Sequence, residues 1–419
     1  MADETAATMV SGHERVVMVT SSYPRFAGDT VGTFLEPIAK GLAARGHDVH
    51  IVLPWHPRLA RGARENGLHF HPFRYAPTRA LHVFGYAGAL EADERLRPSA
   101  VAVTPMALLS AWASAARVAR RIQATIVHAH WVVPGGAIAA LAARGVPHVI
   151  SLHGSDVYVA ERYGFARRAA RFALRRAAWV TSCSDDLRGR ALGLGADPHR
   201  TTTIPYGVDA DRFHPDATRR AAYRERLGLG EATAIVFTAG RFVRKKGFEY
   251  LIEAFGLAPL ASKRATLVVA GGGDLERDLR TRADRIGSSR IRFIGLIAQD
   301  EIAGYLAAAD IAAVPSVRDE AGNVDGLPNV VMEALASATP LVATTAGGIP
   351  SVVEHGRTGM LVAERSPAEL ASAISRLIDD SGLRARLGAA ARQQVVSRHA
   401  WVDVARRFEE VYRSAHACL

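Results

Sequence analysis

The chain has 419 residues, 49% of them hydrophobic, and its 52 Lys and Arg against 41 Asp and Glu give a formal charge of +11. This length predicts two domains, and the apolar content suits two buried cores and excludes a disordered chain. The two cysteines, Cys183 and Cys418, give no support to a disulfide framework or a cysteine-rich zinc site. Residues 1–210 hold 24 Lys and Arg against 16 Asp and Glu, and such a basic excess indicates nucleic acid, anionic lipid or a phosphorylated ligand as partner.

Two segments bear on location. The first fourteen residues carry acids and no apolar core, so they predict a frayed tail and not a signal peptide. Residues 98–116 are uncharged and as long as a membrane span, but they contain Pro105 and are mostly Ala. We therefore expect a cytoplasmic protein in which this segment is an Ala-rich helix, with a membrane span as the alternative.

The first half of the chain alternates between strand and helix patterns. Residues 15–20 (RVVMVT) form a short apolar run, and residues 34–54 then show helical spacing, a stop at Gly46 and a second β-branched run. The same order returns at residues 124–154, where TIVHAH and HVISLH flank an Ala-rich helix. Strand, helix and strand in this order predict parallel βαβ units, and hence an open, doubly wound α/β domain.

Near Ile204 the pattern changes to IPYGVDADRFHPDATRRAAYRERLG, which we interpret as a domain linker. The second half repeats the first scheme, with predicted strands in AIVFTAGRF, ATLVVAGGG, IRFIG, DIAAVPS, PLVATTAGG and GMLVA. The last segment, WVDVARRFEEVYRSA, has a helical apolar stripe that must pack on another surface. We predict domains at 1–205 and 206–398, and a helix within 399–419 that packs back across their junction. Facing α/β domains place helix N-termini on both sides of a cleft, which suits phosphates.

The sequence lacks the motifs of several well-known enzyme classes. The sequence has no Gly-Lys dipeptide for a P-loop, no G-x-S-x-G elbow and no H-E-x-x-H zinc helix. GGGDLE follows a predicted strand, but Glu276 stands where the dinucleotide fingerprint needs a small residue. A nicotinamide-dependent enzyme is therefore the least favoured interpretation.

Charged residues follow the predicted strands. GRFVRKKG places Arg241 and Lys246 directly after a buried strand, where two cations can bind a diphosphate and neutralise it as a leaving group; solvated surface charge is the alternative. His153 in SLHGSD also follows a strand, as a catalytic candidate or a satisfied core residue. For His128 and His130 in HAHW we favour packing over metal binding, because no carboxylate or cysteine cluster is near in sequence.

An acidic loop, VRDEAGNVDGLP, precedes a helix predicted to begin near Asn329, with Pro328 suited to its first turn. Glu333, about one turn into this helix, can point toward the cleft and accept hydrogen bonds from sugar hydroxyls. The N–H groups of Gly326, Leu327 and Asn329 can face a donor molecule without obstruction. An interface or capping role for Glu333 is the alternative.

Six motifs together resemble the retaining glycosyltransferases of the GT-B fold, family 4, over nearly the whole chain: GTFLEPIAKGLAARGHDV, HGSD, IPYGVDADRF, GRFVRKKG, GLPNVVMEALA and GGIPSVVEHGRTGMLV. The resemblance implies two Rossmann-like domains facing across a cleft. The N-terminal domain would lie on the acceptor side, and the C-terminal domain would bind a nucleotide sugar.

The resemblance also implies residue roles. Arg241 and Lys246 would hold the diphosphate, His153 would lie by the reacting carbon, and Gly32 would line the donor site. Glu333 would be the second acid of a Glu-x7-Glu pair that contacts the nucleotide sugar, with the loop Gly326, Leu327, Pro328 and Asn329 beside it. Asp325 stands in place of the first Glu and is one methylene shorter, so Asp319 and Glu320 are alternative acids.

The implied activity is transfer of a sugar from a nucleotide diphosphate donor to a saccharide or lipid-linked acceptor, with retention by front-face substitution. No metal or cofactor is expected: Arg241 and Lys246 would supply the positive charge, and the one D-x-D, Asp209 to Asp211, lies in the inter-domain segment. The motif set is similar to that of enzymes of bacterial surface polysaccharide assembly. The alternatives are a phosphorylase, a nucleotide-sugar epimerase or a non-catalytic nucleotide-sugar-binding protein.

Residues 162–176 (RYGFARRAARFALRR) contain six Arg and no acid, with Phe165 and Phe172 seven residues apart. Such a helix can rest on anionic lipid at the inner face of a membrane, where a lipid-linked acceptor would be presented. A solvated helix with a core stripe is the alternative. We expect no nucleic-acid partner.

Overall fold

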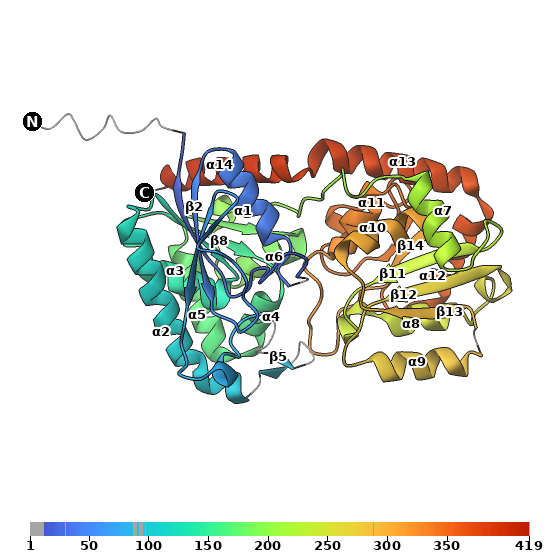
Figure 1. The fold of residues 1–419 in the computed structure, drawn as a ribbon, viewed down its shortest axis with the longest axis horizontal. Coiled ribbons are helices and arrows are strands. Elements are labelled where there is room, and N and C mark those ends of the chain that lie inside the picture. Colours follow the sequence, from blue (N-terminus) through green and yellow to red (C-terminus); the bar gives the residue numbers. More distant parts are fainter. Residues whose placement is uncertain are drawn as a thin grey trace, which may run out of the picture.

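The computed structural model describes residues 12–29, 31–86, 90–91, 95–96, 98–287 and 289–418, so most of the predicted N-terminal tail lies outside the described residues. Two sheets of mainly parallel strands, each with helices on both faces, lie side by side (Figure 1). The prediction of two doubly wound α/β domains is confirmed.

The first sheet has the strand order β10-β9-β8-β7-β1-β2-β4-β3, and only β3 is antiparallel to its neighbour. Its central strands are continuous apolar runs, as expected for parallel strands that are buried on both faces. The strands are β1 (Arg15–Val19), β2 (Asp48–Pro54), β3 (Arg64–Glu65), β4 (Leu68–Phe73), β7 (Ile126–His130), β8 (His148–Leu152), β9 (Trp179–Ser182) and β10 (Thr201–Thr203). A short pair, β5 (Leu90–Glu91) and β6 (Arg95–Leu96), stands apart from this sheet.

In the described part of this first half the α-helices are α1 (Leu35–Ala44), α2 (Pro98–Arg121), α3 (Ala137–Ala142), α4 (Ser155–Arg162), α5 (Gly164–Arg176) and α6 (Asp185–Gly193). Helix α2 is the Ala-rich helix that the sequence predicts, and its buried residues include Ala107, Ala111 and Ala115. Its outer face exposes Met106 and Leu109. Among the described helices it alone is long and apolar enough to cross a membrane, by length and composition.

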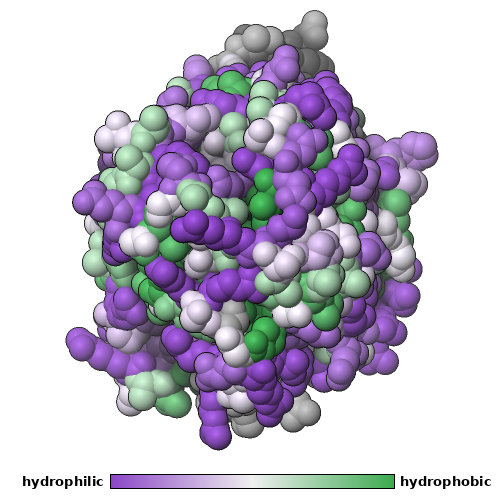
Figure 2. Space-filling view, turned by 90° about the vertical axis from the view of Figure 1, so that its right-hand side faces the viewer, coloured by the Kyte–Doolittle hydropathy of each residue, from purple (hydrophilic) through white to green (hydrophobic). Residues whose placement is uncertain are grey.

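The second sheet is fully parallel, in the order β13-β12-β11-β14-β15-β16. Its strands are β11 (Ala234–Ala239), β12 (Ala265–Ala270), β13 (Ile291–Gly295), β14 (Ile311–Val314), β15 (Leu341–Thr344) and β16 (Met360–Val362). Its helices are α8 (Phe248–Ala254), α9 (Glu276–Arg285), α10 (Gln299–Ala308), α11 (Asn329–Ala336), α12 (Pro367–Asp379) and α13 (Ser381–Arg398). The end of the molecule formed by this half is dominated by hydrophilic residues, with hydrophobic residues in small separate spots (Figure 2).

The segment interpreted as a linker differs from the prediction because it contains a helix, α7 (Ala217–Arg226), which packs on α10. Its Arg224 is 3% exposed and pairs with Asp310 at 3.2 Å between Nη1 and Oδ2. This arginine is buried because an acid and backbone carbonyls satisfy its guanidinium.

The last helix, α14 (Trp401–His416), packs on the first half of the molecule, against α1 (Figure 1). Phe408 and Tyr412 are buried there, and the Tyr412 hydroxyl lies 2.8 Å from Nδ1 of His128 on β7. The chain passes from the first half to the second near Val208 and returns near His399. These two segments lie side by side, and the N–H of Val208 donates a hydrogen bond to the carbonyl of His399. Two adjacent segments therefore join the halves, one on the way out and one on the way back.

Candidate active site

The two domains meet where the loop before α11 touches the turn after β8. A Cβ atom built on Gly326 would lie 2.6 Å from the carbonyl oxygen of His153 and 2.8 Å from Sγ of Cys183. Both distances are shorter than real Cβ contacts, so any side chain at this position would push the two backbones apart. The GLP motif therefore marks a close approach between the N-terminal and C-terminal domains.

The paired glycines Gly347 and Gly348 support this loop from behind. A Cβ atom on Gly348 would lie 1.8 Å from the carbonyl oxygen of Gly326, and one on Gly347 would lie 2.1 Å from that of Asp325. Gly347 also has a φ of +53°, which favours glycine. The AGGIP segment therefore fixes the position of residues 325 and 326 by backbone packing.

Two lysines surround the Asp325 carboxylate. Nζ of Lys246 lies 2.6 Å from Oδ2 of Asp325, and Nζ of Lys245 lies 3.5 Å from Oδ1. Burial opposes ionisation of Asp325, but the charges of Lys246, Lys245 and Arg241 outweigh it and lower the pKa of this carboxyl. Arg241 is exposed at the end of β11. The predicted cations and the shortened acid thus come together, and in this arrangement Asp325 is paired with Lys246.

The two alternative acids lie in the loop before Asp325. The Asp319 carboxylate accepts a hydrogen bond from the backbone N–H of Asn323 at 2.8 Å and so closes the acidic loop on itself. Glu320 is exposed. Asp325 forms salt bridges to both lysines, as the carboxylate assigned to the first acid position.

Glu333 lies on α11 and is 6% exposed. Its burial raises its pKa to about 7, although a hydrogen bond with Gln299 and the charges of Arg212 and Lys246 favour the ionised form. Pro328 precedes α11 in an extended conformation, so it ends the loop and does not form the first helical turn as predicted.

The start of α11 also reaches the N-terminal domain. Nδ2 of Asn329 lies 3.3 Å from Oγ1 of Thr33, the residue after Gly32. Gly32 has a φ of +67°, in the region that favours glycine. The structure therefore brings the predicted donor loop and the predicted Gly32 loop to the same junction.

His153 has both ring nitrogens occupied by protein groups. Nδ1 lies 2.9 Å from the Tyr206 hydroxyl, and Nε2 lies 3.0 Å from Nδ1 of His130. Burial lowers the pKa of His153 to about 3, so the ring is neutral at physiological pH. Phe34 packs on the same ring at a centroid distance of 4.6 Å. It is the carbonyl oxygen of His153, near Gly326, that faces the donor loop.

His128 is hydrogen-bonded inside the domain, with Nε2 2.7 Å from Oγ of Ser151 and Nδ1 bonded to Tyr412. In the described part of the chain, His128 and His130 belong to no group of three potential metal ligands. The geometry agrees with the packing interpretation of these two residues.

The sequence interpretation missed Asp156, which holds the turn that carries His153. Its carboxylate accepts hydrogen bonds from the N–H groups of Val132 at 2.6 Å and Gly154 at 3.0 Å, and the residue is 3% exposed. Burial raises the pKa of Asp156, while these backbone N–H groups lower it. The Asp of HGSD, at the first turn of α4, was the available signal.

The fold and this junction define a GT-B protein, and comparison with known proteins supports that class. Residues 31–212 match the family described as Glycosyltransferase Family 4, and residues 233–380 match Glycosyl transferases group 1. Crystal structures of Anabaena HepE with UDP and of sucrose-phosphate synthase from Thermosynechococcus elongatus have TM-scores of 0.76 and 0.78. Their sequences are 21% and 20% identical to this chain. The superpositions cover 96% and 97% of this chain and 100% of each of the two structures, so they establish the fold.

One relative establishes the family, and two others agree with it. A D-inositol 3-phosphate glycosyltransferase of Nocardioides sp. is 32% identical over 319 residues, which is 70% of this chain and 68% of the relative. The teichuronic acid biosynthesis glycosyltransferase TuaC of Bacillus subtilis, itself named as putative, is 27% identical over 86% of this chain and 88% of its own. A GDP-mannose-dependent phosphatidylinositol monomannoside mannosyltransferase of Mycobacterium tuberculosis is 34% identical over 57% of this chain and 62% of its own length. The chain belongs to the family 4, group 1 glycosyltransferases, and the resemblance is confirmed.

Proposed function

We propose that this protein transfers a sugar from a nucleotide diphosphate sugar to a saccharide or lipid-linked acceptor, with retention at the anomeric carbon and without a metal ion. The observation that carries the proposal is the junction itself. Lys246, Asp325 and Glu333 from the C-terminal domain lie at the loop that touches the His153 turn of the N-terminal domain. A nucleotide sugar bound by these three residues of the C-terminal domain would have its sugar beside the His153 turn of the N-terminal domain.

The proposed chemistry assigns charge stabilisation to fixed side chains. Lys246 and Arg241 neutralise the diphosphate as it leaves, which is the role a metal ion has in other transferases. When phosphate oxygens take over Lys246, the Asp325 carboxylate becomes available to a sugar hydroxyl. The carbonyl oxygen of His153 stabilises positive charge at the anomeric carbon. The departing phosphate takes the acceptor proton, since the ring of His153 is already hydrogen-bonded on both sides.

The names of the relatives indicate which donors and acceptors to test first. Relatives from Mycobacterium tuberculosis and Corynebacterium glutamicum are named as GDP-mannose-dependent, so GDP-mannose is the first donor to test beside UDP-sugars. The experiment measures nucleoside diphosphate release from each nucleotide sugar, with and without D-inositol 3-phosphate or phosphatidylinositol monomannoside, and with and without a chelator.

Each mechanism predicts a different result in this screen. Acceptor-dependent release that survives the chelator supports the proposal. Conversion of the donor sugar without release indicates an epimerase, and binding without turnover indicates a non-catalytic module. Activity that is lost to the chelator and restored by magnesium contradicts metal independence.

We also propose that the N-terminal domain makes peripheral contact with anionic membrane on the cytoplasmic side. Six arginines around α5 are exposed, and Phe165 beside them is 64% exposed. The buried face of α5 consists of Ala166, Ala170, Ala173 and Leu174. Helix α3 packs between α5 and α2, and exposed Leu141, Met106 and Leu109 extend the apolar part of this surface. Basic and apolar groups together suit an anionic lipid surface.

Vesicle sedimentation tests this contact. The protein should sediment more with anionic than with neutral vesicles at low salt, and Arg167→Glu with Arg171→Glu should abolish the difference. The matched control reverses two exposed arginines of α9 in the other domain, Arg277→Glu and Arg285→Glu, and should retain it. Equal sedimentation with both vesicle types, or equal losses in both double variants, would contradict the contact.

A further inference from the structure

A cluster of polar side chains lies on one face of the first sheet, away from the junction. Asp48 and His50 are on β2, and His69 and His71 are on β4. The two strands pair in parallel with His50 opposite His69, and residues two apart in a strand share a face, so all four side chains point to the same side. Asp48 is the first residue of β2 and His69 the second of β4. The cluster therefore lies at the end of the sheet where the strands begin, and the candidate active site lies at the opposite end, where the strands finish.

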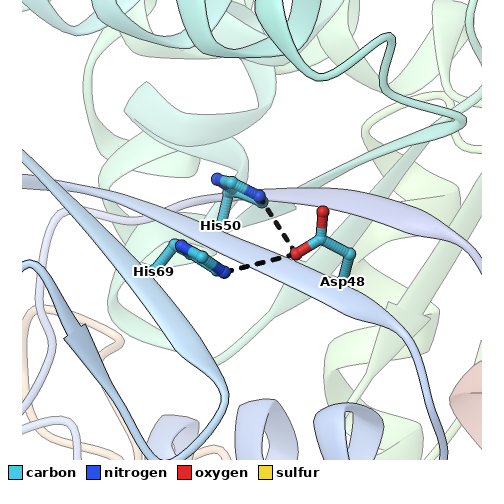
Figure 3. A group of neighbouring side chains, drawn as sticks. All are labelled: Asp48, His50 and His69. Carbon is cyan, nitrogen blue, oxygen red and sulfur yellow. Dashed lines mark hydrogen bonds and ion pairs between the residues drawn. The ribbon is translucent and has the colours of Figure 1, made fainter.

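Three of these side chains converge on one point (Figure 3). Nε2 of His50 lies 3.1 Å and Nε2 of His69 lies 3.5 Å from the same oxygen, Oδ1 of Asp48. One ligand atom from each residue lies within 4.8 Å of the others. Zinc bonds to nitrogen and oxygen are about 2.0–2.2 Å long, so ligand atoms of a tetrahedral zinc ion lie roughly 3.3–3.5 Å apart. The spacing already present is therefore close to what such an ion needs.

A fourth residue orients His50. Nδ1 of His50 lies 2.9 Å from Nε2 of His71. A histidine that coordinates a metal through Nε2 carries its proton on Nδ1 and donates it to an acceptor behind the ring, which fixes the tautomer. Nε2 of His71 is the atom placed to accept that hydrogen bond.

The cluster is open to solvent on one side. The side chain of Asp48 is 45% exposed and that of His69 is 27% exposed, whereas that of His50 is 7% exposed. A metal ion can thus enter at Asp48 and keep a water molecule as a further ligand. The charged groups that bear on this cluster include Asp48, which favours a cation, and two that oppose it: Arg121, and Arg64, which stands opposite His69 in the β3–β4 pair.

We propose that Asp48, His50 and His69 form a binding site for a divalent ion of the zinc class, with His71 holding His50 in the ligating tautomer. Two histidine nitrogens and one carboxylate oxygen are the donor types that such ions take, and hard ions such as Mg²⁺ prefer oxygen alone. The ion would join β2 to β4 near the edge of the sheet. The site is separate from the donor site, so it leaves the proposed metal-independent transfer unaffected.

The test uses the full chain without an affinity tag, stripped with a chelator and titrated with cobalt(II) and then zinc. We expect one equivalent of cobalt with the intense visible absorption of a four-coordinate ion, displaced by zinc. Because zinc binds the folded state, we also expect it to raise the unfolding temperature. His69→Gln and Asp48→Asn should each abolish the signal at the same concentrations, and His71→Ala, which removes the acceptor, should weaken affinity about 10- to 100-fold, the range for residues behind a metal ligand.

Controls make each outcome decisive. His199→Gln changes an exposed histidine elsewhere on the N-terminal domain and should bind cobalt like the wild type. Circular dichroism and nucleotide binding show whether each variant is folded. Binding that is absent in the wild type overturns the proposal, as does binding that persists unchanged in folded His69→Gln and Asp48→Asn. Cobalt absorption typical of six-coordination would overturn the assigned ligand geometry.

Discussion

Glu333 should make donor binding depend on pH in a way that one substitution removes. The pKa of Glu333 is about 7 without ligand because the carboxyl is buried, so it is about half protonated near neutral pH. A carboxylate can accept hydrogen bonds from two ribose hydroxyls, whereas the protonated form presents a donor in place of one acceptor, and we expect only the ionised form to bind the donor. If the ligand selects the ionised form, binding must include the loss of a proton below pH 7, and affinity rises as pH rises through 7.

The magnitude follows from the same value. The apparent dissociation constant is multiplied by 1 + 10^(7 − pH), which is about 11 at pH 6 and about 1.1 at pH 8, so affinity should improve about tenfold between them. That is about 1.4 kcal/mol. Glu333→Gln should remove this pH dependence and weaken binding at pH 8 by about 1.5–3 kcal/mol, the scale of a hydrogen bond to a charged group.

Calorimetry with a nucleotide sugar from pH 6 to 8 measures both effects, since the phosphates of a nucleotide sugar do not titrate in that range. Glu354→Gln changes an exposed acid on the surface of the same domain and should keep the wild-type profile. Wild-type binding that is flat between pH 6 and 8 would refute the reasoning, as would an equal slope in Glu333→Gln.

Three further predictions concern the cations and the core. Lys246→Ala should cost about 2.7–4 kcal/mol of transition-state stabilisation in transfer assays, whereas Lys263→Ala, which breaks a surface ion pair with Asp379, should not change the rate; equal losses would show that Lys246 has no special role. Asp325→Asn frees Lys246, so calorimetry should show nucleoside diphosphate binding as tight as in the wild type or tighter while transfer slows, and parallel losses in both would contradict this assignment. Phe408→Ala should lower the free energy of urea unfolding by about 3–5 kcal/mol because the ring is 3% exposed, in contrast to the exposed Val402→Ala; a small effect would mean that α14 is not firmly packed.

The fold was predictable because its central strands are short apolar runs that alternate with helices, a pattern that specifies parallel sheets without knowledge of distant contacts. The segment interpreted as a linker shows what composition leaves out: its change of pattern marks the domain boundary, but the packing of α7 through Arg224 and Asp310 depends on a contact far along the chain. The edge strands β3 and β10 are only two and three residues long. They are too short to show an alternation of apolar and polar residues, so the sequence does not predict them.

The sequence places the candidate site residues in loops that follow strands, but it does not predict the contacts between those loops. That Lys246 pairs with Asp325 depends on two loops far apart in the chain, and the AGGIP turn that positions Asp325 acts through backbone packing. His153 is predicted as a catalytic residue, and its ring is bonded to His130 and Tyr206, which no sequence spacing could indicate. Whether His153, Arg241 and Gly32 touch a donor stays a prediction.

The same limit applies to the metal cluster. Side chains two residues apart in a strand point to the same face, so Asp48 and His50 share one face of β2, and His69 and His71 share one face of β4. The convergence of His69 on Asp48 follows only from the register between the two strands, which pairs His50 with His69. Register between strands is a tertiary property, so the sequence interpretation considered His128 and His130 and missed this group.

The most direct test of the account is the configuration of the product that the protein makes from an α-linked nucleotide sugar, followed by proton NMR of the anomeric signals during the reaction. The account predicts that the donor signal is replaced by that of an α-glycoside of the acceptor, with a chelator present and with release of nucleoside diphosphate in equal amount. A β-glycoside would contradict retention by front-face substitution. Loss of the donor signal to free sugar alone, with every acceptor that supports binding, would contradict the claim that this protein is a transferase.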